Sequence, residues 1–75
     1  MDKIKAGDIV SWKWFRGVVQ GEVLDVIQDR VEIISKGKRI VRLGTSDNPA
    51  VVILHKNGNE VLKLQSELLY QVENQ

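Results

Sequence analysis

The clearest structural signal in the chain lies in residues 50–64, which read AVVILHKNGNEVLKL. Asn57-Gly58 is the pair preferred in a two-residue turn with positive φ at both positions, so the stretch predicts a β-hairpin. In this register apolar residues face apolar residues along most of both strands. His55 then lies opposite Glu60, as a cross-strand polar pair.

Further strands are predicted on the N-terminal side of this hairpin. Residues 9–14 and 18–28 are rich in Val and Ile and alternate with a period of two, which is typical of β-strands. Gly21 lies inside the second of these stretches. A glycine inside a strand indicates a bulge, a sharp bend or the close approach of another backbone.

Residues 30–43 predict a second hairpin. With a three-residue loop from Lys36 to Lys38, Val31 lies opposite Leu43, and the register matches apolar with apolar residues and acidic with basic residues. A three-residue loop usually has its glycine in the last position, whereas Gly37 lies in the middle.

The C-terminal part of the sequence completes a small all-β fold. Residues 44–49 predict a polar loop, and Ser66 predicts the cap of a single helical turn that buries Leu68. We expect a core from residue 5 to residue 70 and a frayed tail over 71–75. Short strands and tight turns favour closure into an SH3-like (Tudor-like) barrel of about five strands with a terminal one-turn helix. An OB-type barrel is the alternative.

Length and composition limit what the chain can do. Its 75 residues, 43% hydrophobic and 28% charged, describe one small domain over 1–75 and exclude a multidomain enzyme. The formal net charge is +1, so attraction to nucleic acid must come from a local patch. Cysteine is absent, which excludes disulfides and thiolate sites. No apolar run approaches the roughly 20 residues of a bilayer span, and we expect a cytoplasmic chain that does not bind membranes.

Several separated blocks carry a recognisable pattern. They are Gly7-Asp8 with Val10, Trp12 and Trp14; Gly17-x-Val19-x-Gly21-x-Val23; Asn48-Pro49-Ala50; Val61-Leu62-Lys63-Leu64; and Ser66-Glu67-Leu68. Together they resemble the hypervirulence-associated Tudor-like family from about Lys5 to Leu69. The resemblance implies an SH3-like barrel. It implies no catalytic or binding residue, because a fold does not by itself define a function.

Aromatic residues provide the first candidate site. Trp12 and Trp14 lie two residues apart on one strand and share a face, with Phe15 next in sequence and Tyr70 near the barrel seam. Aromatic walls bind quaternary ammonium groups through cation–π attraction, although large indoles also fill small cores. We expect at least one of the two tryptophans to line an exposed groove. The principal hypothesis is a non-catalytic adaptor that binds a polypeptide segment or protein partner through this aromatic surface.

Basic residues provide the second candidate site. Residues 30–43 contain five basic side chains and one acidic side chain, whereas both flanks are net acidic. The alternative function is a nucleic-acid-binding module in which this hairpin contacts phosphates. Its candidate residues are Lys36, Lys38, Arg39 and Arg42, with Lys13 and Arg16 as helpers. The other interpretation is a solvated hairpin whose cations protect strand edges against aggregation.

The residue pattern does not indicate catalysis or a metal site. His55 is the only histidine, and without cysteine we expect no zinc. The sequence has neither a nucleophile elbow nor a glycine-rich phosphate loop. We therefore expect no enzyme activity, no cofactor and no metal. A third alternative is a structural barrel that self-associates through an uncovered strand edge, although we expect a monomer.

Overall fold

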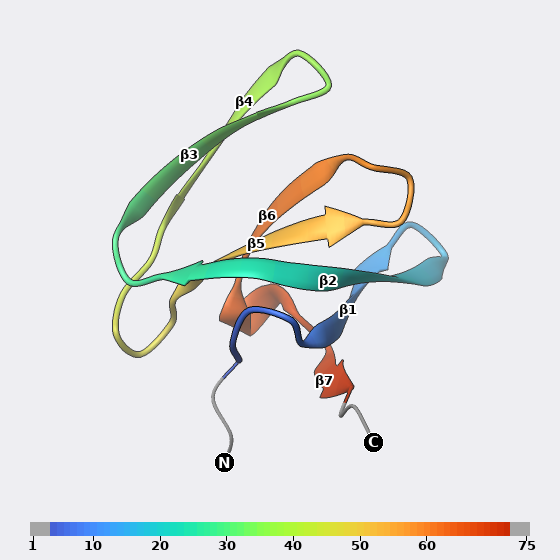
Figure 1. Ribbon diagram of the computed structural model, residues 1–75, viewed down its shortest axis with the longest axis horizontal. Coiled ribbons are helices and arrows are strands. Elements are labelled where there is room, and N and C mark those ends of the chain that lie inside the picture. The colour runs from blue at the N-terminus through green and yellow to red at the C-terminus, as the bar shows by residue number, and fades with distance from the viewer. Residues whose placement is uncertain (1–3, 73–75) are drawn as a thin grey trace.

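Seven β-strands and one short 3₁₀ helix make up the described part of the chain (Figure 1). The computed structural model describes residues 4–72, and the side chains of residues 4–69. The elements are β1 (Ile9–Trp14), β2 (Gly17–Ile27), β3 (Arg30–Ser35), β4 (Lys38–Leu43), β5 (Ala50–His55), β6 (Glu60–Leu64), η1 (Gln65–Glu67) and β7 (Tyr70–Val72). Within residues 4–72, no helix has the length and apolar character needed to cross a membrane.

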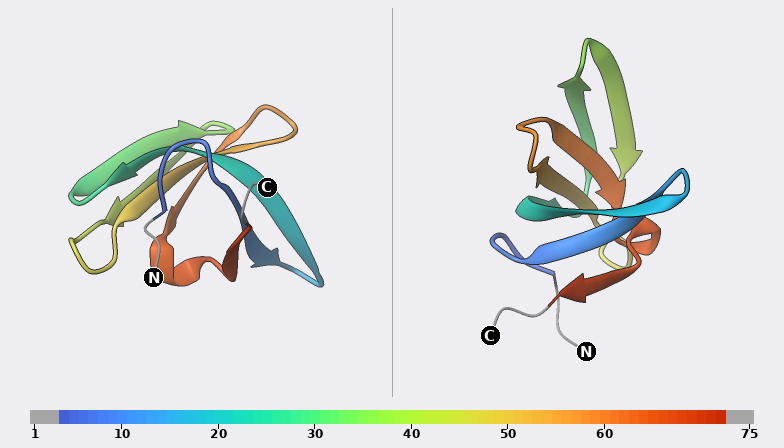
Figure 2. Two further views of the ribbon diagram at one scale, coloured as in Figure 1. Left: turned by 60° about the horizontal axis from the view of Figure 1, so that its bottom comes forward. Right: turned by 90° about the vertical axis from the view of Figure 1, so that its right-hand side faces the viewer.

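Five of the strands form one antiparallel sheet in the order β6-β5-β2-β1-β7, and β3 pairs only with β4. The sheet curls into a half-barrel because β7, at the end of the chain, returns to pair with β1 at its start (Figure 2). This order is that of an SH3-like barrel with the β3–β4 hairpin inserted between β2 and β5. The predicted all-β, SH3-like fold is confirmed.

The register of the β3–β4 hairpin differs from the prediction by one residue. Val31 lies opposite Arg42 and not opposite Leu43. The loop contains two residues instead of three, because Lys36 (φ 53°) and Gly37 (φ 78°) both adopt positive φ. Such a turn matches the twist of the flanking strands, and glycine tolerates its conformation at no steric cost.

This shift turns β4 over relative to the prediction, since neighbouring residues of a strand point to opposite faces. Ile40 packs against the core cluster that contains Leu62. Lys38 and Arg42 share the face of Ile40, and Arg39 lies on the other face. The one-residue shift therefore decides which cations face the sheet.

The loop between β5 and β6 contains three residues, so the predicted two-residue turn at Asn57-Gly58 is wrong. Of the three, Lys56, Asn57 and Gly58, only the glycine has positive φ, at 93°. The His55 N–H donates a hydrogen bond to the Asn59 carbonyl oxygen at 2.9 Å and closes the loop. A three-residue loop that ends in a left-handed glycine is another common hairpin geometry.

The longer loop also moves the β5–β6 register by one residue. Val51 lies opposite Lys63, where the prediction places Leu64. His55 lies opposite Asn59, so its predicted pairing with Glu60 is wrong. By strand alternation, His55 and Lys63 both point to the face of the sheet that carries Val51.

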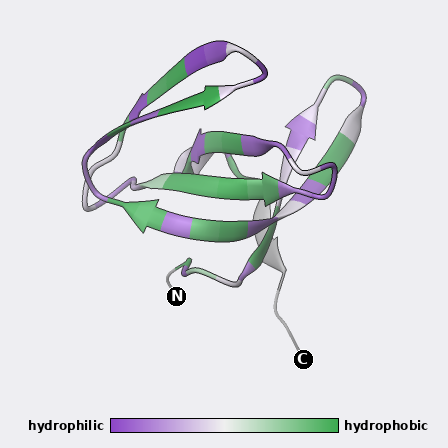
Figure 3. Cartoon of the chain, turned by 45° about the horizontal axis from the view of Figure 1, so that its top comes forward, coloured by the Kyte–Doolittle hydropathy of each residue, from purple (hydrophilic) through white to green (hydrophobic). Residues whose placement is uncertain are grey.

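Two core clusters occupy the two faces of β5, which is hydrophobic along nearly its whole length (Figure 3). The first core cluster contains Val10, Trp12, Val23, Val51 and Ile53. The second contains Ala50, Val52 and Leu62, and Val31, Ile33 and Ile40 of the inserted hairpin pack against it. Burying one such aliphatic side chain stabilises a fold by about 1.5 to 3 kcal/mol. Apolar contacts therefore fix the hairpin against the sheet.

Gly21 lies where a second backbone approaches and not at the bulge that its position in the strand predicts. A Cβ at this position would lie 2.5 Å from Ile53 Cγ2 and 2.8 Å from the Leu54 carbonyl oxygen. The irregularity in β2 lies further along the strand, between Val23 and Asp25. Gly21 therefore serves close packing against β5 and not the bulge.

The C-terminal elements differ in detail from the prediction. The helical turn begins after Leu64 instead of at Ser66, and Leu68 packs against the first core cluster as predicted. Gln71 and Val72 belong to β7, so the prediction of a frayed tail from residue 71 is wrong for these two; residues 73–75 lie outside the described residues. Pairing with β1 supplies the backbone hydrogen bonds that make this polar segment a strand.

Candidate ligand-binding groove

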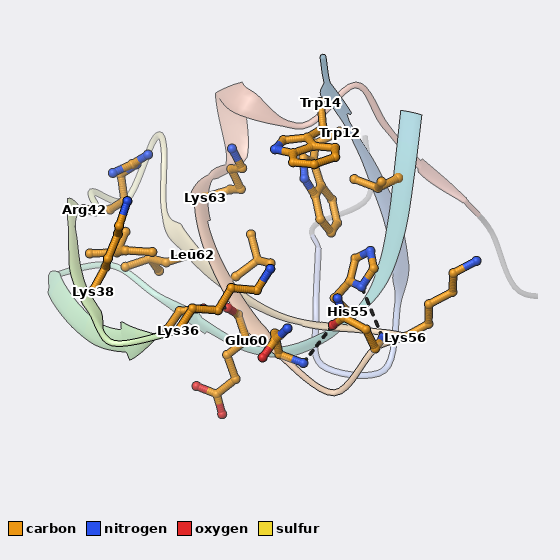
Figure 4. Close-up of a pocket in the computed structure, with 16 residues that line it drawn as sticks. Trp12, Trp14, Lys36, Lys38, Arg42, His55, Lys56, Glu60, Leu62 and Lys63 are labelled. Carbon is orange, nitrogen blue, oxygen red and sulfur yellow. Dashed lines mark hydrogen bonds between the residues drawn. The ribbon is translucent and has the colours of Figure 1, made fainter. Parts of the chain in front are cut away.

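An open groove of about 560 Å³ lies where three hairpins meet. Its walls come from β1, from the β3–β4 hairpin and from the β5–β6 hairpin. Figure 4 shows Trp12 and Trp14 on one side, Lys38 and Arg42 on the opposite side, and Lys36 between them. The volume lies within the range of ligand sites in proteins. Because the walls are distant in sequence, only the folded domain contains the groove.

The two tryptophans play different parts in this groove. Trp12 is only 3% exposed and belongs to the first core cluster, where its ring meets the His55 ring edge-on with centroids 6.2 Å apart. Trp14 is 59% exposed. Both lie on one face of β1 and both line the groove. Trp12 therefore forms part of the floor, and Trp14 presents its ring to solvent.

The other two aromatic candidates lie at the edges of the site. Phe15 is 80% exposed, and its ring contacts that of Trp14 with centroids 4.4 Å apart and an interplanar angle of 60°. It does not line the groove but extends the aromatic surface beyond Trp14. Tyr70 lies in β7 opposite Ser11, and its side chain is outside the described side chains.

The groove is strongly basic. Five basic side chains line it, and Glu60 is the one carboxylate among the lining residues. The basic residues are Lys36, Lys38, Arg42, Lys56 and Lys63. Within residues 4–72, the salt bridges do not involve Lys36, Lys38 or Lys56. These three ammonium groups are therefore available to an anion from outside.

Arg42 is held by its neighbours and acts mainly as a wall of the groove. Its Nε lies 3.0 Å from Glu67 Oε1, and its Nη1 donates to the Val41 carbonyl oxygen at 3.0 Å. Partial burial acts to raise the pKa of Glu67, but a hydrogen bond from the Leu64 N–H and the charges of Arg42 and Lys63 together lower it. Glu67 therefore ties β4 to η1 as an ionised carboxylate.

The remaining basic candidates lie outside the groove. Arg39 lies on the outer face of β4, with its Nε 2.9 Å from Glu32 Oε2. Lys13 is exposed on the face of β1 opposite to the tryptophans, and Arg16 is exposed in the turn between β1 and β2. Of the six basic candidates, the structure brings Lys36, Lys38 and Arg42 to the tryptophans and leaves the other three elsewhere.

Sequence reasoning missed the contribution of the β5–β6 hairpin. Lys56 and Lys63 add two of the five cations, and His55 and Asn59 add polar lining. The three-residue loop sets the register that places His55, Asn59 and Lys63 on one face of the hairpin. A loop with Gly58 in its last position was the sequence signal for this register.

Two polar lining side chains, Ser35 and His55, are engaged in structural hydrogen bonds. Ser35 Oγ donates to the Glu60 carbonyl oxygen at 2.8 Å, and His55 Nδ1 accepts from the Asn57 N–H at 3.2 Å. Ser35 is the one hydroxyl among the lining side chains. In the part of the chain that the structure describes, no three His, Asp or Glu side chains gather as a metal site would require. The groove therefore places basic side chains next to an aromatic surface.

The fold and this groove define a small SH3-like β-domain with a basic, aromatic cleft. The chain matches the model of the family described as hypervirulence associated proteins TUDOR domain over residues 7–68. It therefore belongs to that family, as the sequence resemblance predicted. No curated protein and no solved structure matches the chain.

Proposed function

We propose that this chain is a non-catalytic binding module whose groove holds a segment of an extended polyanion. The observation that carries the proposal is the meeting of Trp12 and Trp14 with Lys36 and Lys38 in one groove. The aromatic surface and the basic hairpin, which the sequence presents as alternative sites, form a single surface. A ligand that fits both has negative charge and an apolar or planar part.

The charge of the groove argues against a methyl-lysine ligand. A cation–π cage contributes about 0.5 to 2 kcal/mol per good contact. The groove contains five basic side chains and one carboxylate, so it repels a cationic ligand. Trp12, moreover, is buried, so only Trp14 offers a free ring face within the groove. The same arrangement attracts phosphates or carboxylates.

The engagement of Ser35 and His55 supports a role in binding instead of catalysis. The Ser35 hydroxyl joins β3 to β6, and the His55 ring nitrogen stabilises the β5–β6 loop. A serine nucleophile is commonly activated by an adjacent base, whereas the Ser35 hydroxyl and His55 Nδ1 are each hydrogen-bonded to backbone. Both side chains therefore shape the groove.

A charge reversal with a matched control tests the proposal. Lys38→Glu changes a groove residue, whereas Lys13→Glu makes the same change on the opposite face of β1. Affinity is measured by fluorescence anisotropy with labelled oligothymidylate, polyglutamate and heparin fragments at several salt concentrations. We expect at least one probe to bind, and Lys38→Glu to weaken it and reduce the slope of log affinity against log salt by about 1. Equal effects of the two variants, or binding of no probe at low salt, contradict the proposal.

A further inference from the structure

We infer that the polyanion is a single-stranded nucleic acid, one base of which stacks on an aromatic ledge formed by Trp14 and Phe15. The inference rests on the proposed function, because it assigns the phosphates of that ligand to the groove cations. It extends the binding surface beyond the groove to the exposed ring of Phe15, which contacts the groove residue Trp14.

The first observation is the backbone conformation of Phe15 in the β1–β2 loop. Trp14 pairs with Gly17, so Phe15 and Arg16 form a two-residue loop. Phe15 has φ of 52° in this loop, a left-handed conformation that favours glycine and is unusual for a bulky side chain. The ring is nevertheless 80% exposed, so little burial offsets the strain. The pairing of β1 with β2 maintains this conformation, as the pairing of β3 with β4 does at Lys36, and exposed residues held in this way are frequent at ligand-contacting positions.

The second observation is the contact between the rings of Trp14 and Phe15. Trp14 and Phe15 contact each other with centroids 4.4 Å apart, and both rings remain more than half exposed. The contact joins the two rings into one exposed aromatic surface. Exposed aromatic rings are the elements on which single-strand binders stack bases.

The third observation is that three cations of the groove lack a salt bridge within the described part of the chain. Lys36 and Lys38 flank the tip of the β3–β4 hairpin, and Lys56 begins the β5–β6 loop that faces it across the groove. These ammonium groups have no salt-bridge partner among residues 4–72. A backbone that runs through the groove from the β3–β4 hairpin to Trp14 passes Lys38 and Lys36. Lysine contacts to phosphate carry no base preference, so we expect weak dependence on sequence.

The ledge distinguishes a single strand from other polyanions. An acidic peptide supplies carboxylates but no planar group as large as a base at every repeat. A duplex keeps its bases stacked on one another and hidden from the ledge. Only an unpaired strand presents both a free base face and a phosphate at each step.

Three probes and two variants test the inference. The probes are an oligothymidylate of about ten nucleotides, which is within the site size of known single-strand binders, an abasic backbone of the same length, and polyglutamate. The variants are Phe15→Gly, which relieves the backbone strain, and Trp14→Leu. We expect oligothymidylate to bind about tenfold tighter than the abasic strand, since one base stacks on an aromatic ring. It should also quench the fluorescence of Trp14.

Phe15→Gly separates binding from folding. We expect a thermal midpoint equal to or above that of the parent chain and an affinity for oligothymidylate that is several-fold weaker, with no change for the abasic strand. Trp14→Leu should lose the fluorescence change. Equal affinity for the oligothymidylate and the abasic strand, tighter binding of polyglutamate, or full affinity in Phe15→Gly contradicts the inference but leaves the proposed function standing. Binding of none of the probes contradicts both.

Discussion

The two ends of β1 differ sharply, although they share one face of one strand. Val10 and Trp12 are 0% and 3% exposed and belong to the first core cluster. Trp14 is 59% exposed, and Phe15 in the following turn is 80% exposed. Large apolar side chains therefore stabilise the barrel at the inner end of the strand and remain in solvent at the outer end. Residues that stabilise the barrel and residues that we propose to bind the ligand therefore occupy separate stretches of the same strand, so substitutions can separate the two roles.

The largest expected effect distinguishes the two indoles directly. Trp12→Ala removes a buried ring from the core and should lower the free energy of unfolding by about 3 to 5 kcal/mol. This is a large share of the stability of a small domain. Trp14→Ala should cost much less, because more than half of its side chain is already in solvent. Urea denaturation of both variants measures the two losses in the free energy of unfolding. Equal losses contradict the difference in packing between the two ends.

Two glycines of β2 give a second comparison between the same ends. Gly21 lies opposite Val10 and Gly17 opposite Trp14. A Cβ at Gly21 meets Ile53 Cγ2 and the Leu54 backbone, whereas a Cβ at Gly17 has no neighbour within 4 Å. Gly21→Ala should therefore destabilise the fold by about 1 to 3 kcal/mol through overpacking.

The matched change at the outer end has a different expected result. Gly17→Ala should alter stability by no more than about 0.5 kcal/mol, as is usual for exposed sites. Thermal denaturation of the two variants side by side provides the measurement. A loss at Gly17 as large as that at Gly21 means that the outer end is packed as tightly as the inner end, contrary to the structure.

A further small effect concerns the wall of the groove that faces the tryptophans. The pKa of Glu67 is lowered in the folded protein, so its ionised form contributes stability that is present above its ordinary pKa. This contribution is lost as the pH falls through the lower folded value. Glu67→Gln should cost no more than about 1 kcal/mol at neutral pH, which is typical of a surface ion pair.

Denaturation over a range of pH checks this prediction. The difference in stability between the parent chain and Glu67→Gln should shrink in acid, where the carboxyl becomes protonated. Arg42→Gln provides the control, since it removes the partner of the same pair. A difference that stays constant from neutral to acidic pH contradicts an ionic contribution of Glu67.

The strands and the fold class follow from local sequence. Alternation and β-branched residues define β1 and β2 to within one residue, and Asn57-Gly58 marks a hairpin. The hairpin registers do not follow in the same way. Loop length depends on which residues adopt positive φ, and Lys36 does so although its type has no preference for that conformation. The residue type does not predict this conformation, because the pairing of the whole hairpin stabilises it.

The groove was harder to predict than the strands for the same reason. Trp12 and Trp14 are evident as a pair, but their unequal burial depends on where the other hairpins end. The inward position of Lys38 and the contribution of Lys63 both depend on registers that differ by one residue from the prediction. β7 was missed because Gln71 and Val72 form a strand only through pairing with β1.

Amide and indole chemical shifts during titration with oligothymidylate test the central claim most directly. The account predicts that the Trp14 indole N–H and the amides of Lys36 and Lys38 shift together at low salt, and that the changes fade as salt is added. Shifts confined to Lys13 or to Arg39 on the outer faces, with the groove unchanged, would contradict it.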